Sequence, residues 1–363
     1  MKDTERKRYI DGIKGVACCA IVLGHYCGIY TFAQDASQIQ CKVMLTLTDS
    51  FFGFFTNSGL WLLLFFVISG YLLAYARMNT FLDFFKKAIV RFVRLALPVL
   101  GAGLMIYGIQ QIFGFYNGEL QTVVPNQWIA SSYQNRVSLA DVFMSPYRVL
   151  LQGDAVINAP YWVLKDMFLG SLLIYASSYV KNRVEKRFPY APEVLGAVLL
   201  GGLLIWNRII LFACVFGMLI NWEEPRIGKL YRKSKLLPLL GLVLPVAGYL
   251  LENDVFYCFC IAALLTAIPE IPAVRKACET KLLLWLGKLS FGIYSLHWPV
   301  ICSLGAVVLL RGSMRVNNNV LALLAFALCF GAVLLLSFLF HITFEKWTGW
   351  ICGKMQRFPS QRE

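Results

Sequence analysis

Three side chains with the potential for chemistry lie within one strongly apolar stretch, YIDGIKGVACCAIVLGHYCGIY, from Tyr9 to Tyr30. They are Asp11, Lys14 and His25. A helix rising about 1.5 Å per residue places His25 roughly 21 Å above Asp11 and roughly 16 Å above Lys14, on nearly the same face. We therefore expect three polar groups in line that do not touch one another in a straight helix. In a helix this apolar, which would lie in a membrane, ionisable groups far from the helix end are costly and usually functional. A hydrogen bond from His25 to a neighbouring helix explains that histidine equally well.

A second group of candidates lies in FFVISGYLLA and in FFKKAIVRFVRLALP. The latter is an amphipathic segment in which Arg91 and Arg94 are one helical turn apart, so both guanidinium groups face the same way. Paired arginines suit a phosphate-rich ligand. Lipid headgroups, or simple placement of positive charge at a membrane, account for them as well. Ser69, in the first of these stretches, reads as a hydrogen-bonding residue of helix packing rather than as a nucleophile.

Further candidates lie near the C-terminus, in GKLSFGIYSLHWPV and beyond. His297 is predicted at a depth similar to that of His25, where it either orients His25 or the substrate, or serves as a structural histidine following Tyr294. His341 and Glu345 are one turn apart and predict a local structural pair. The sequence has no metal-ligand spacing, glycine-rich phosphate loop or nucleic-acid motif. We therefore expect no metal and no nucleic-acid partner.

The elements that position these residues follow from composition. Of 363 residues, 58% are hydrophobic and 15% charged, with a mean hydropathy of +0.64, too few polar residues to cover a soluble protein of this length. We predict an all-α, polytopic membrane helix bundle, a single integral-membrane domain over residues 1–363. About ten transmembrane helices are expected, near residues 10–32, 58–76, 92–113, 160–180, 192–206, 208–221, 236–251, 254–268, 282–310 and 319–345.

The orientation follows from the distribution of basic residues. With the N-terminus inside, twenty-five of the 34 lysines and arginines lie in segments on the cytoplasmic side and six on the opposite side, as the positive-inside rule predicts. Both termini are then cytoplasmic, and the net charge of +14 reflects loops beside anionic lipid. We expect a multi-pass protein of the cell membrane, with no cleaved signal peptide. The sequence does not decide between a monomer and a homo-oligomer.

One long segment departs from the apolar pattern. Residues 114–158 are polar and aromatic and are predicted to form an extracytoplasmic loop; loops of this length are usually functional or disordered. Trp128, Tyr133, Tyr147 and Tyr161 are candidates for stacking on a sugar ring. Ordinary anchoring of aromatic side chains at a membrane interface is the alternative.

Five motifs together resemble one family. YIDGIKGVACCAIVLGH resembles the first-helix signature of the acyltransferase family 3 membrane proteins, usually Asp-Gly-Leu-Arg-Gly followed by Gly-His. FFVISGYLL is similar to the second-helix motif, and RFVR, from Arg91 to Arg94 with Pro98, resembles the paired-arginine motif. GKLSFGIYSLHWPV resembles the late Ser-Tyr-x-x-Tyr-x-x-His helix, and NAPYWVLKDM resembles the Asn-x-Pro-x-Trp segment. The motifs occur in the family's order across most of the chain.

The resemblance implies an enzyme that transfers an acyl group, commonly acetyl from cytoplasmic acetyl-CoA as co-substrate, to a hydroxyl of an extracytoplasmic glycan or related small acceptor. It matches His25 to the family's catalytic histidine and Asp11 to the first-helix acid. Lys14, Arg91 and Arg94 would hold the phosphates of the acyl-CoA at the cytoplasmic mouth. The residues expected to bind the substrates are Ser69, Tyr161, Trp162, Tyr294 and His297.

Two departures from the family pattern bear on this expectation. Lys14 stands where the family usually has arginine, which keeps the charge but loses the bidentate geometry for phosphate. Met167 stands at the position of the family's usual glutamate. Asp166 is adjacent, but one helical step rotates it about 100° away from that face. Any role for a carboxylate at this place, and the nature of the acceptor, are therefore open.

The expected mechanism brings the thioester up inside the bundle to His25. The imidazole, with an unperturbed pKa of about 6.5, would act as general base on the acceptor hydroxyl, or would carry the acyl group covalently. A secondary transporter of a polar metabolite or glycan intermediate is the main alternative. Transporters usually show repeated halves and interrupted helices, which this sequence lacks. A catalytically silent member that binds lipid or proteins is the second alternative.

Overall fold

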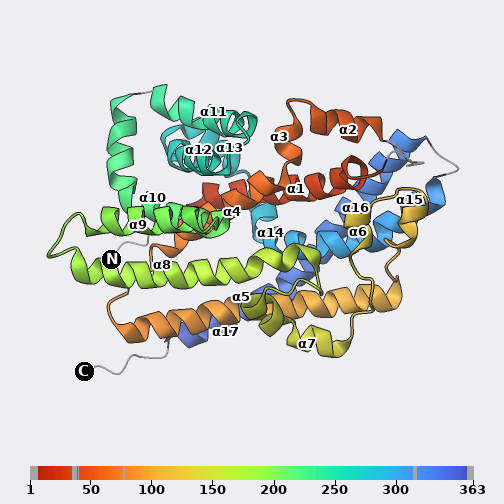
Figure 1. The fold of residues 1–363 in the computed structure, drawn as a ribbon, viewed down its shortest axis with the longest axis horizontal. Coiled ribbons are helices and arrows are strands. Elements are labelled where there is room, and N and C mark those ends of the chain that lie inside the picture. The colour runs from red at the N-terminus through yellow and green to blue at the C-terminus, as the bar shows by residue number, and fades with distance from the viewer. Residues whose placement is uncertain are drawn as a thin grey trace.

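Every regular element among the described residues is helical. The computed structural model describes residues 7–34, 39, 41–76, 78–234, 236–313 and 317–357 (Figure 1). Of the basic residues behind the predicted orientation, Lys2, Arg6, Arg77, Lys235, Arg315 and Arg362 lie outside this part of the chain. The helices are α1 (Arg8–Thr31), α2 (Lys42–Asp49), α3 (Gly53–Thr56), α4 (Ser58–Leu73), α5 (Phe81–Ile112), α6 (Gln127–Ala130), α7 (Leu139–Tyr147), α8 (Leu164–Val184), α9 (Ala191–Ile205), α10 (Ile209–Lys233), α11 (Leu236–Leu250), α12 (Asp254–Ala267), α13 (Pro272–Cys278), α14 (Lys281–Val300), α15 (Ala306–Gly312), α16 (Asn318–Phe340) and α17 (Lys346–Arg357).

Each of the ten predicted spans coincides with a helix. Five helical stretches in the described residues are long and apolar enough to cross a membrane: Arg8–Thr31, Phe81–Ile112, Ala159–Val184, Lys281–Gly312 and Asn318–Arg357. A sixth is added if Asp254–Glu270 and Pro272–Cys278, bent by 104° at their junction, count as one span. Helices α4, α9 and α11 are apolar but shorter. The all-helical class is therefore confirmed, whereas ten spans and their orientation stay predictions.

The third predicted span begins earlier than residue 92. The amphipathic segment with the two arginines and the span that follows are one continuous helix of 32 residues, α5, with Pro98 inside it. It starts at Phe81 because Thr80 and Asp83 form a capping box, in which each side chain binds the other residue's backbone N–H. The arginines are therefore held by the rigid first half of a long helix and not by a separate surface segment.

Helices α1 and α14 pack side by side with their backbones in contact. A Cβ atom added at Gly287 would lie 1.9 Å from the carbonyl oxygen of Asp11, and one added at Gly15 would lie 2.6 Å from that of Leu283. Glycine at these places is what allows the close approach, as in other helix pairs of membrane proteins. The pair fixes the relative height of side chains along α1 and α14.

Gly287→Ala is therefore expected to lower the free energy of unfolding by at least about 2 kcal/mol, because the backbone of α1 cannot yield to the new methyl group. Thermal unfolding of the purified protein in detergent checks this. Gly331→Ala is the matched control, because a Cβ at this helical glycine in α16 meets nothing within 4 Å. Equal unfolding temperatures for the two variants would contradict the backbone contact.

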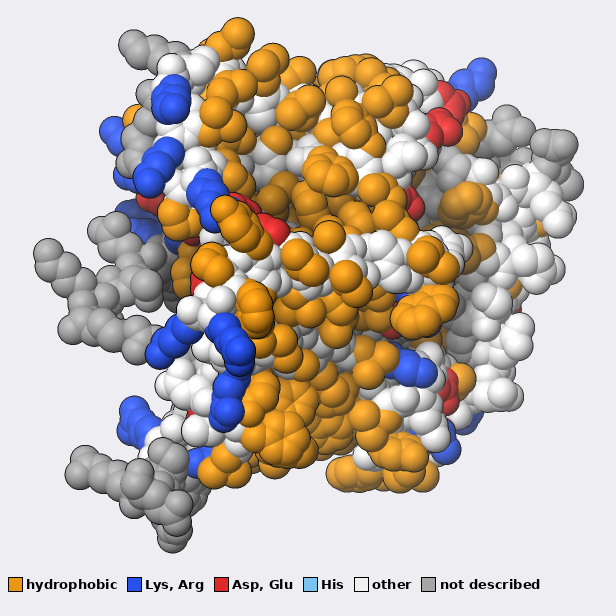
Figure 2. All heavy atoms as spheres, turned by 60° about the vertical axis from the view of Figure 1, so that its left-hand side comes forward, with side chains coloured by type: hydrophobic (Ala, Val, Ile, Leu, Met, Phe, Trp, Pro, Cys, Tyr) orange, Lys and Arg blue, Asp and Glu red, His pale blue; other side chains and the backbone are white. Residues whose placement is uncertain are grey.

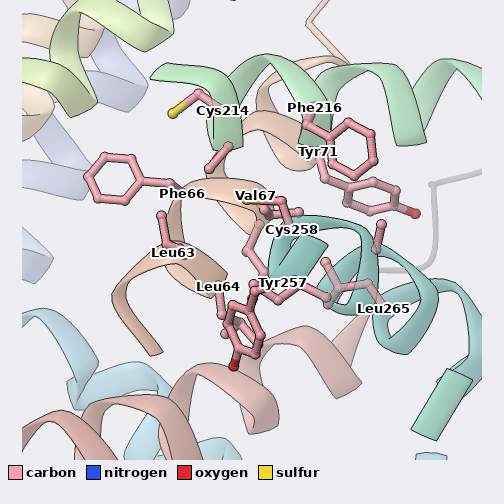
Figure 3. Close-up of a cluster of buried hydrophobic side chains, with 14 of the residues drawn as sticks. Leu63, Leu64, Phe66, Val67, Tyr71, Cys214, Phe216, Tyr257, Cys258 and Leu265 are labelled. Atoms are coloured by element: carbon pink, nitrogen blue, oxygen red, sulfur yellow. The ribbon is translucent and has the colours of Figure 1, made fainter. Parts of the chain in front are cut away.

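A buried hydrophobic cluster joins α4, α10 and α12 (Figure 3). Phe66 and Val67 of α4 meet Cys214 of α10 and Cys258 of α12, all at most 1% exposed. The eleven cysteines of the chain are all unpaired and mostly buried, consistent with their use as small apolar side chains.

The surface has a broad apolar band with lysine and arginine side chains gathered along one edge (Figure 2). We call this edge the basic end. It includes the exposed Arg183 in the last turn of α8 and Lys186 and Arg187 just after that helix. Helix α1 begins and α17 ends on the same side (Figure 1). This arrangement agrees with the asymmetry of charge in the sequence.

Candidate active site

His25 of α1 and His297 of α14 form a hydrogen-bonded pair, with 2.7 Å between His25 Nδ1 and His297 Nε2. The other ring nitrogen of His297, Nδ1, lies 3.1 Å from the carbonyl oxygen of Ile293. A carbonyl oxygen only accepts, so in the neutral pair His297 carries its proton on Nδ1 and accepts at Nε2. His25 must then donate from Nδ1, which leaves its Nε2 with a lone pair and no partner among the described residues. The arrangement directs the basic nitrogen of His25 away from His297.

Two tryptophans surround this pair. The His25 ring lies edge-on to Trp128, with 5.8 Å between centroids, and to Trp298, with 5.7 Å. Trp298 Nε1 donates to Ser132 Oγ at 2.9 Å. His297 is fully buried, whereas His25 is partly exposed. The pair is therefore enclosed by aromatic rings but is not sealed.

The segment 114–158 places Trp128 on His25. It folds into short helices, and Asn126 donates from Nδ2 to the carbonyl oxygens of Gly28 and Ile29 at 3.0 and 2.9 Å. The Oδ1 of Asn126 caps α6, which begins one residue later. A Cβ at Gly28 would lie 2.7 Å from the ring of Trp128, so glycine is needed for this contact. One buried asparagine thus joins the end of α1 to the loop.

The other aromatic residues of the loop have different surroundings. Tyr133 stacks on Phe115 with 3.9 Å between centroids, and burial raises the pKa of its hydroxyl well above the usual value. Tyr147 is 48% exposed and Tyr161 is fully buried. Of the four candidates for sugar stacking, only Trp128 contacts the histidine pair.

Asp11 and Lys14 form a salt bridge, with 2.9 Å between Lys14 Nζ and Asp11 Oδ1. The expectation that the three polar groups of this helix do not touch is therefore wrong for these two. Residues three apart are neighbours on a helix surface, and the long lysine side chain reaches back over one turn. His25 remains separate from both, as its height on the helix requires.

An inner cavity of about 560 Å³ lies between α1, α4, α5, α8 and α14. Its lining is mostly apolar, but it includes Lys14, Arg91, Arg94, Ser69 and Tyr294. Five of the residues predicted to bind the donor or the substrate therefore line one cavity, and they come from the four helices α1, α4, α5 and α14.

Arg91 is fixed at the wall of this cavity by two serine hydroxyls. Its Nε donates to Ser171 Oγ at 2.9 Å, and its Nη2 lies 3.4 Å from Ser69 Oγ. The hydroxyls satisfy part of the guanidinium fork without neutralising its charge. Arg94 is exposed, and the described residues offer it no ion pair. Both arginines therefore keep positive charge available for an anionic ligand.

A second cavity of about 460 Å³ adjoins the inner cavity and shares Arg91 and Arg94 with it. We call it the entrance cavity; it adds Lys86, Lys87 and Asp83 of α5, together with Tyr175 of α8 and residues near the end of α17. The arginine pair thus stands between a cationic space at the basic end and a long apolar space beyond it. Such a shape suits a ligand with an anionic head and a thin arm.

The inner cavity ends at Tyr294. The ring of this residue lies 6.2 Å from that of His297, and its hydroxyl donates a hydrogen bond to the carbonyl oxygen of Pro160. Asp11, His25, His297, Tyr161 and Trp162 do not line the cavity in the described part of the chain. Tyr294 therefore belongs to the cavity of the arginines and also lies beside the histidine pair.

The remaining candidates lie in the short helix Ala159–Val163 and in the first turn of α8, which follows it. The Tyr161 ring lies 6.3 Å from that of Tyr294, and Trp162 is 55% exposed. Met167 lines the inner cavity, whereas Asp166 pairs with Arg208 at 2.5 Å, as the rotation of one helical step predicts. The carboxylate at position 166 is thus engaged away from the cavity.

Several site residues escaped the sequence analysis. Ser171 gives no motif-level signal, and Trp298 was read only as part of a motif. Lys86 and Lys87 precede Arg91 by one turn or more on one helix, a spacing that would have been a usable signal. The pair of His341 and Glu345 is confirmed at 2.5 Å, but it sits in a π-helical turn, and Glu345 also lines the inner cavity.

No group of three or more His, Cys, Asp or Glu side chains that would hold a metal ion is found among the described residues. A family model described as an acyltransferase domain matches residues 7–342, nearly the whole chain. No curated protein and no solved structure matches the chain.

Proposed function

Because the chain belongs to this acyltransferase family, we propose that it moves an acyl group from acyl-CoA at the basic end to a hydroxyl acceptor at the opposite end of the bundle. The basic end then faces the cytoplasm, with both termini on that side of the cell membrane, as the positive-inside rule favours. The acceptor is a glycan or a related small hydroxyl compound outside. Acyl transfer through the bundle delivers the group without translocating its charged carrier.

The observation that carries this proposal is the pair of cavities that meet at Arg91 and Arg94. Coenzyme A has a phosphate-rich nucleotide end and a long flexible arm with the thioester at its tip. The entrance cavity has four cationic side chains that suit the phosphates: those of Lys86, Lys87, Arg91 and Arg94. The mostly apolar inner cavity, 560 Å³ in volume, suits the arm. Acetyl-CoA is the donor we propose.

The chemistry is assigned to Nε2 of His25. As a general base, this nitrogen takes the proton of the acceptor hydroxyl while the hydroxyl oxygen attacks the thioester carbonyl. The carbon–sulfur bond then breaks, and the thiolate of coenzyme A takes the proton from the imidazolium. In the covalent alternative, Nε2 attacks the carbonyl itself and passes the acyl group to the acceptor afterwards. A trapped acyl group on His25 distinguishes the second route from the first.

The acceptor is assigned to the side of His25 that Trp128 covers. This ring is 36% exposed and lies against the imidazole, so a sugar stacked on it brings a hydroxyl near His25. Asn126 holds the loop in place through the end of α1. The contact supports a glycan acceptor over an acceptor without a ring face.

His297 is expected to matter through the tautomer of His25. His297→Ala removes the acceptor for His25 Nδ1–H, so that Nε2 is no longer the fixed basic nitrogen, and kcat should fall by about 10²-fold with the KM for acetyl-CoA unchanged. His297→Gln restores an oxygen acceptor and should recover part of the rate. Steady-state kinetics of the three proteins check this. A rise in KM at constant kcat would contradict the orienting role.

Acetyl transfer by the purified protein is the direct test of the function. The protein is reconstituted in liposomes and supplied with acetyl-CoA labelled in the acetyl group, with and without a panel of glycans inside. We expect donor-dependent labelling of a glycan, or slow release of labelled acetate without one. Binding of acetyl-CoA with no loss of its thioester under any condition would overturn the proposal in favour of a silent member of the family.

A further inference from the structure

Of the aromatic side chains that line the inner cavity, Tyr294 is the one whose ring lies beside the histidine pair in the described structure. One face of this side chain belongs to the cavity that contains Arg91. The ring of His297 lies 6.2 Å from that of Tyr294, and His297 is hydrogen-bonded to His25. A thioester that rises through the cavity toward His297 therefore meets the ring of Tyr294 before it meets an imidazole.

A frame of fixed backbone holds this ring in place. The Tyr294 hydroxyl donates to the Pro160 carbonyl, in the short helix Ala159–Val163 that precedes α8. That segment is tied to α14 independently, because Asn158 Nδ2 donates to the Ser295 carbonyl oxygen at 2.8 Å. Asn158 and Ser295 are both fully buried. The side chain of Tyr294 can thus turn about its own bonds while the two segments stay together.

Alternative hydrogen-bond partners lie beside the ring. The hydroxyl of Tyr161, whose ring is stacked at 6.3 Å from that of Tyr294, is buried and makes no hydrogen bond of normal geometry in the described part of the chain, with the side chains of Ser295 and Asn158 close beside it. The Oδ1 atom of Asn158 is likewise buried and makes no hydrogen bond of normal geometry in the described residues. Buried polar atoms without partners are rare in native proteins and call for an explanation. Here they offer the Tyr294 hydroxyl a place to bond when it leaves Pro160.

We propose that Tyr294 is a movable partition between the donor cavity and the histidine pair. Closed, it bonds Pro160 and separates His25 from water and solutes that enter at the basic end. Open, it lets the thioester reach Nε2 of His25. Tyr294 is a positioning residue in this scheme and takes no part in bond making. The identity of the solute that passes rests on the proposed function, but the closure itself does not.

Chemical access to position 25 tests the closure without any need for turnover. His25→Cys protein in inside-out vesicles is treated with a charged methanethiosulfonate reagent, and modification of position 25 is followed by peptide mass spectrometry. Tyr294→Phe on this background keeps the ring and loses the bond to Pro160, so labelling should accelerate about threefold to tenfold, the effect of one hydrogen bond on an opening equilibrium. Tyr294→Ala removes the ring and should accelerate labelling further.

Tyr257→Phe is the matched control. Tyr257 lies in the buried cluster of α12 (Figure 3), and its hydroxyl has no hydrogen-bond partner among the described residues, so its loss should leave the labelling rate unchanged. Right-side-out vesicles are the second control, in which substitution of Tyr294 should have no effect. Labelling of the Tyr294→Phe and Tyr294→Ala proteins at the parent rate from the basic end would overturn the partition. If Tyr294→Ala does not fold, Tyr294→Phe alone decides.

A second measurement uses the protein with His25 intact. Tyr294→Phe should raise the hydrolysis of acetyl-CoA in the absence of acceptor, because water from the cavity gains access to the imidazole, while the Kd for coenzyme A stays the same. Faster labelling of position 25 combined with no consumption of acetyl-CoA by any variant would support the partition and reject the proposed function. Hydrolysis and labelling both unchanged by Tyr294→Phe would reject the partition.

Discussion

Replacing His25 with alanine is expected to reduce acetyl transfer by at least about 10³-fold, within the range by which proton-transfer groups accelerate reactions. The substitution removes the one nitrogen that the hydrogen-bond chain from Ile293 through His297 leaves basic. It also removes the only group here able to carry an acyl group covalently at that position. The effect is measured as the formation of labelled glycan, or of labelled acetate, from labelled acetyl-CoA.

Binding of coenzyme A separates loss of chemistry from loss of structure. The arginines line the inner cavity, which His25 does not line in the described structure, so His25→Ala should bind coenzyme A with the affinity of the parent protein. Cys18→Ala, a small change at a buried position of the same helix, should retain activity. Transfer by His25→Ala at a rate near that of the parent would remove His25 from the mechanism.

Replacing Arg91 with alanine is expected to raise the Kd for coenzyme A by about 10²-fold, the usual cost of deleting one partner of a buried, hydrogen-bonded charge. Arg91 lines both cavities and is held by Ser69 and Ser171, so its guanidinium group is oriented before the ligand arrives. Arg91→Lys keeps the charge but loses the paired N–H donors of the guanidinium group, so its Kd should lie between those of the parent protein and Arg91→Ala. Titration calorimetry with coenzyme A gives the three constants.

Arg187→Ala is the matched control for charge alone. Arg187 is exposed at the basic end and is outside both cavities, so its loss should change the affinity only through the general field, an effect that salt removes. If Arg187→Ala and Arg91→Ala weaken binding equally, the entrance cavity is not the donor site. Kinetics at saturating acetyl-CoA should show little change in kcat for Arg91→Lys.

The part of this site that lies on single helices was predictable from the sequence. Helical spacing puts Asp11, Lys14 and His25 on one face, and it puts Arg91 and Arg94 on another, because a period of 3.6 residues is fixed by backbone hydrogen bonds. Both arginines do line the same cavities. The Asp11–Lys14 bridge was missed because the path of a flexible lysine side chain is not set by backbone periodicity.

Contacts between distant segments were outside the reach of such arguments. His25 and His297 are 272 residues apart, and their contact depends on how α1 and α14 slide along each other. The predicted depth of His297 allows it to orient His25, but the sequence leaves the substrate or a purely structural role equally open. Trp128 shows the same limit: its loop has no periodicity, so only the Asn126 contacts reveal that it covers His25.

The short helices mark a different limit. Hydropathy located α9, α11 and α12, but it cannot decide whether each crosses the bilayer or bends within it. The turn of 104° after Glu270 comes from Pro272, which begins a new helix. Amino-acid composition predicts the length of an apolar segment, but it does not predict a bend between two helix axes.

The backbone contact between α1 and α14 also bears on how the protein responds to the lipids around it. Each of these helices contributes one imidazole, and glycines rather than deformable side chains separate their main chains. A thinner or thicker bilayer changes the tilt of helices, but two rods joined in this way tilt as one body. The distance between the two imidazole rings therefore does not change with the thickness of the bilayer. A change in growth temperature or lipid supply should alter the entry of substrates before it alters the histidine pair.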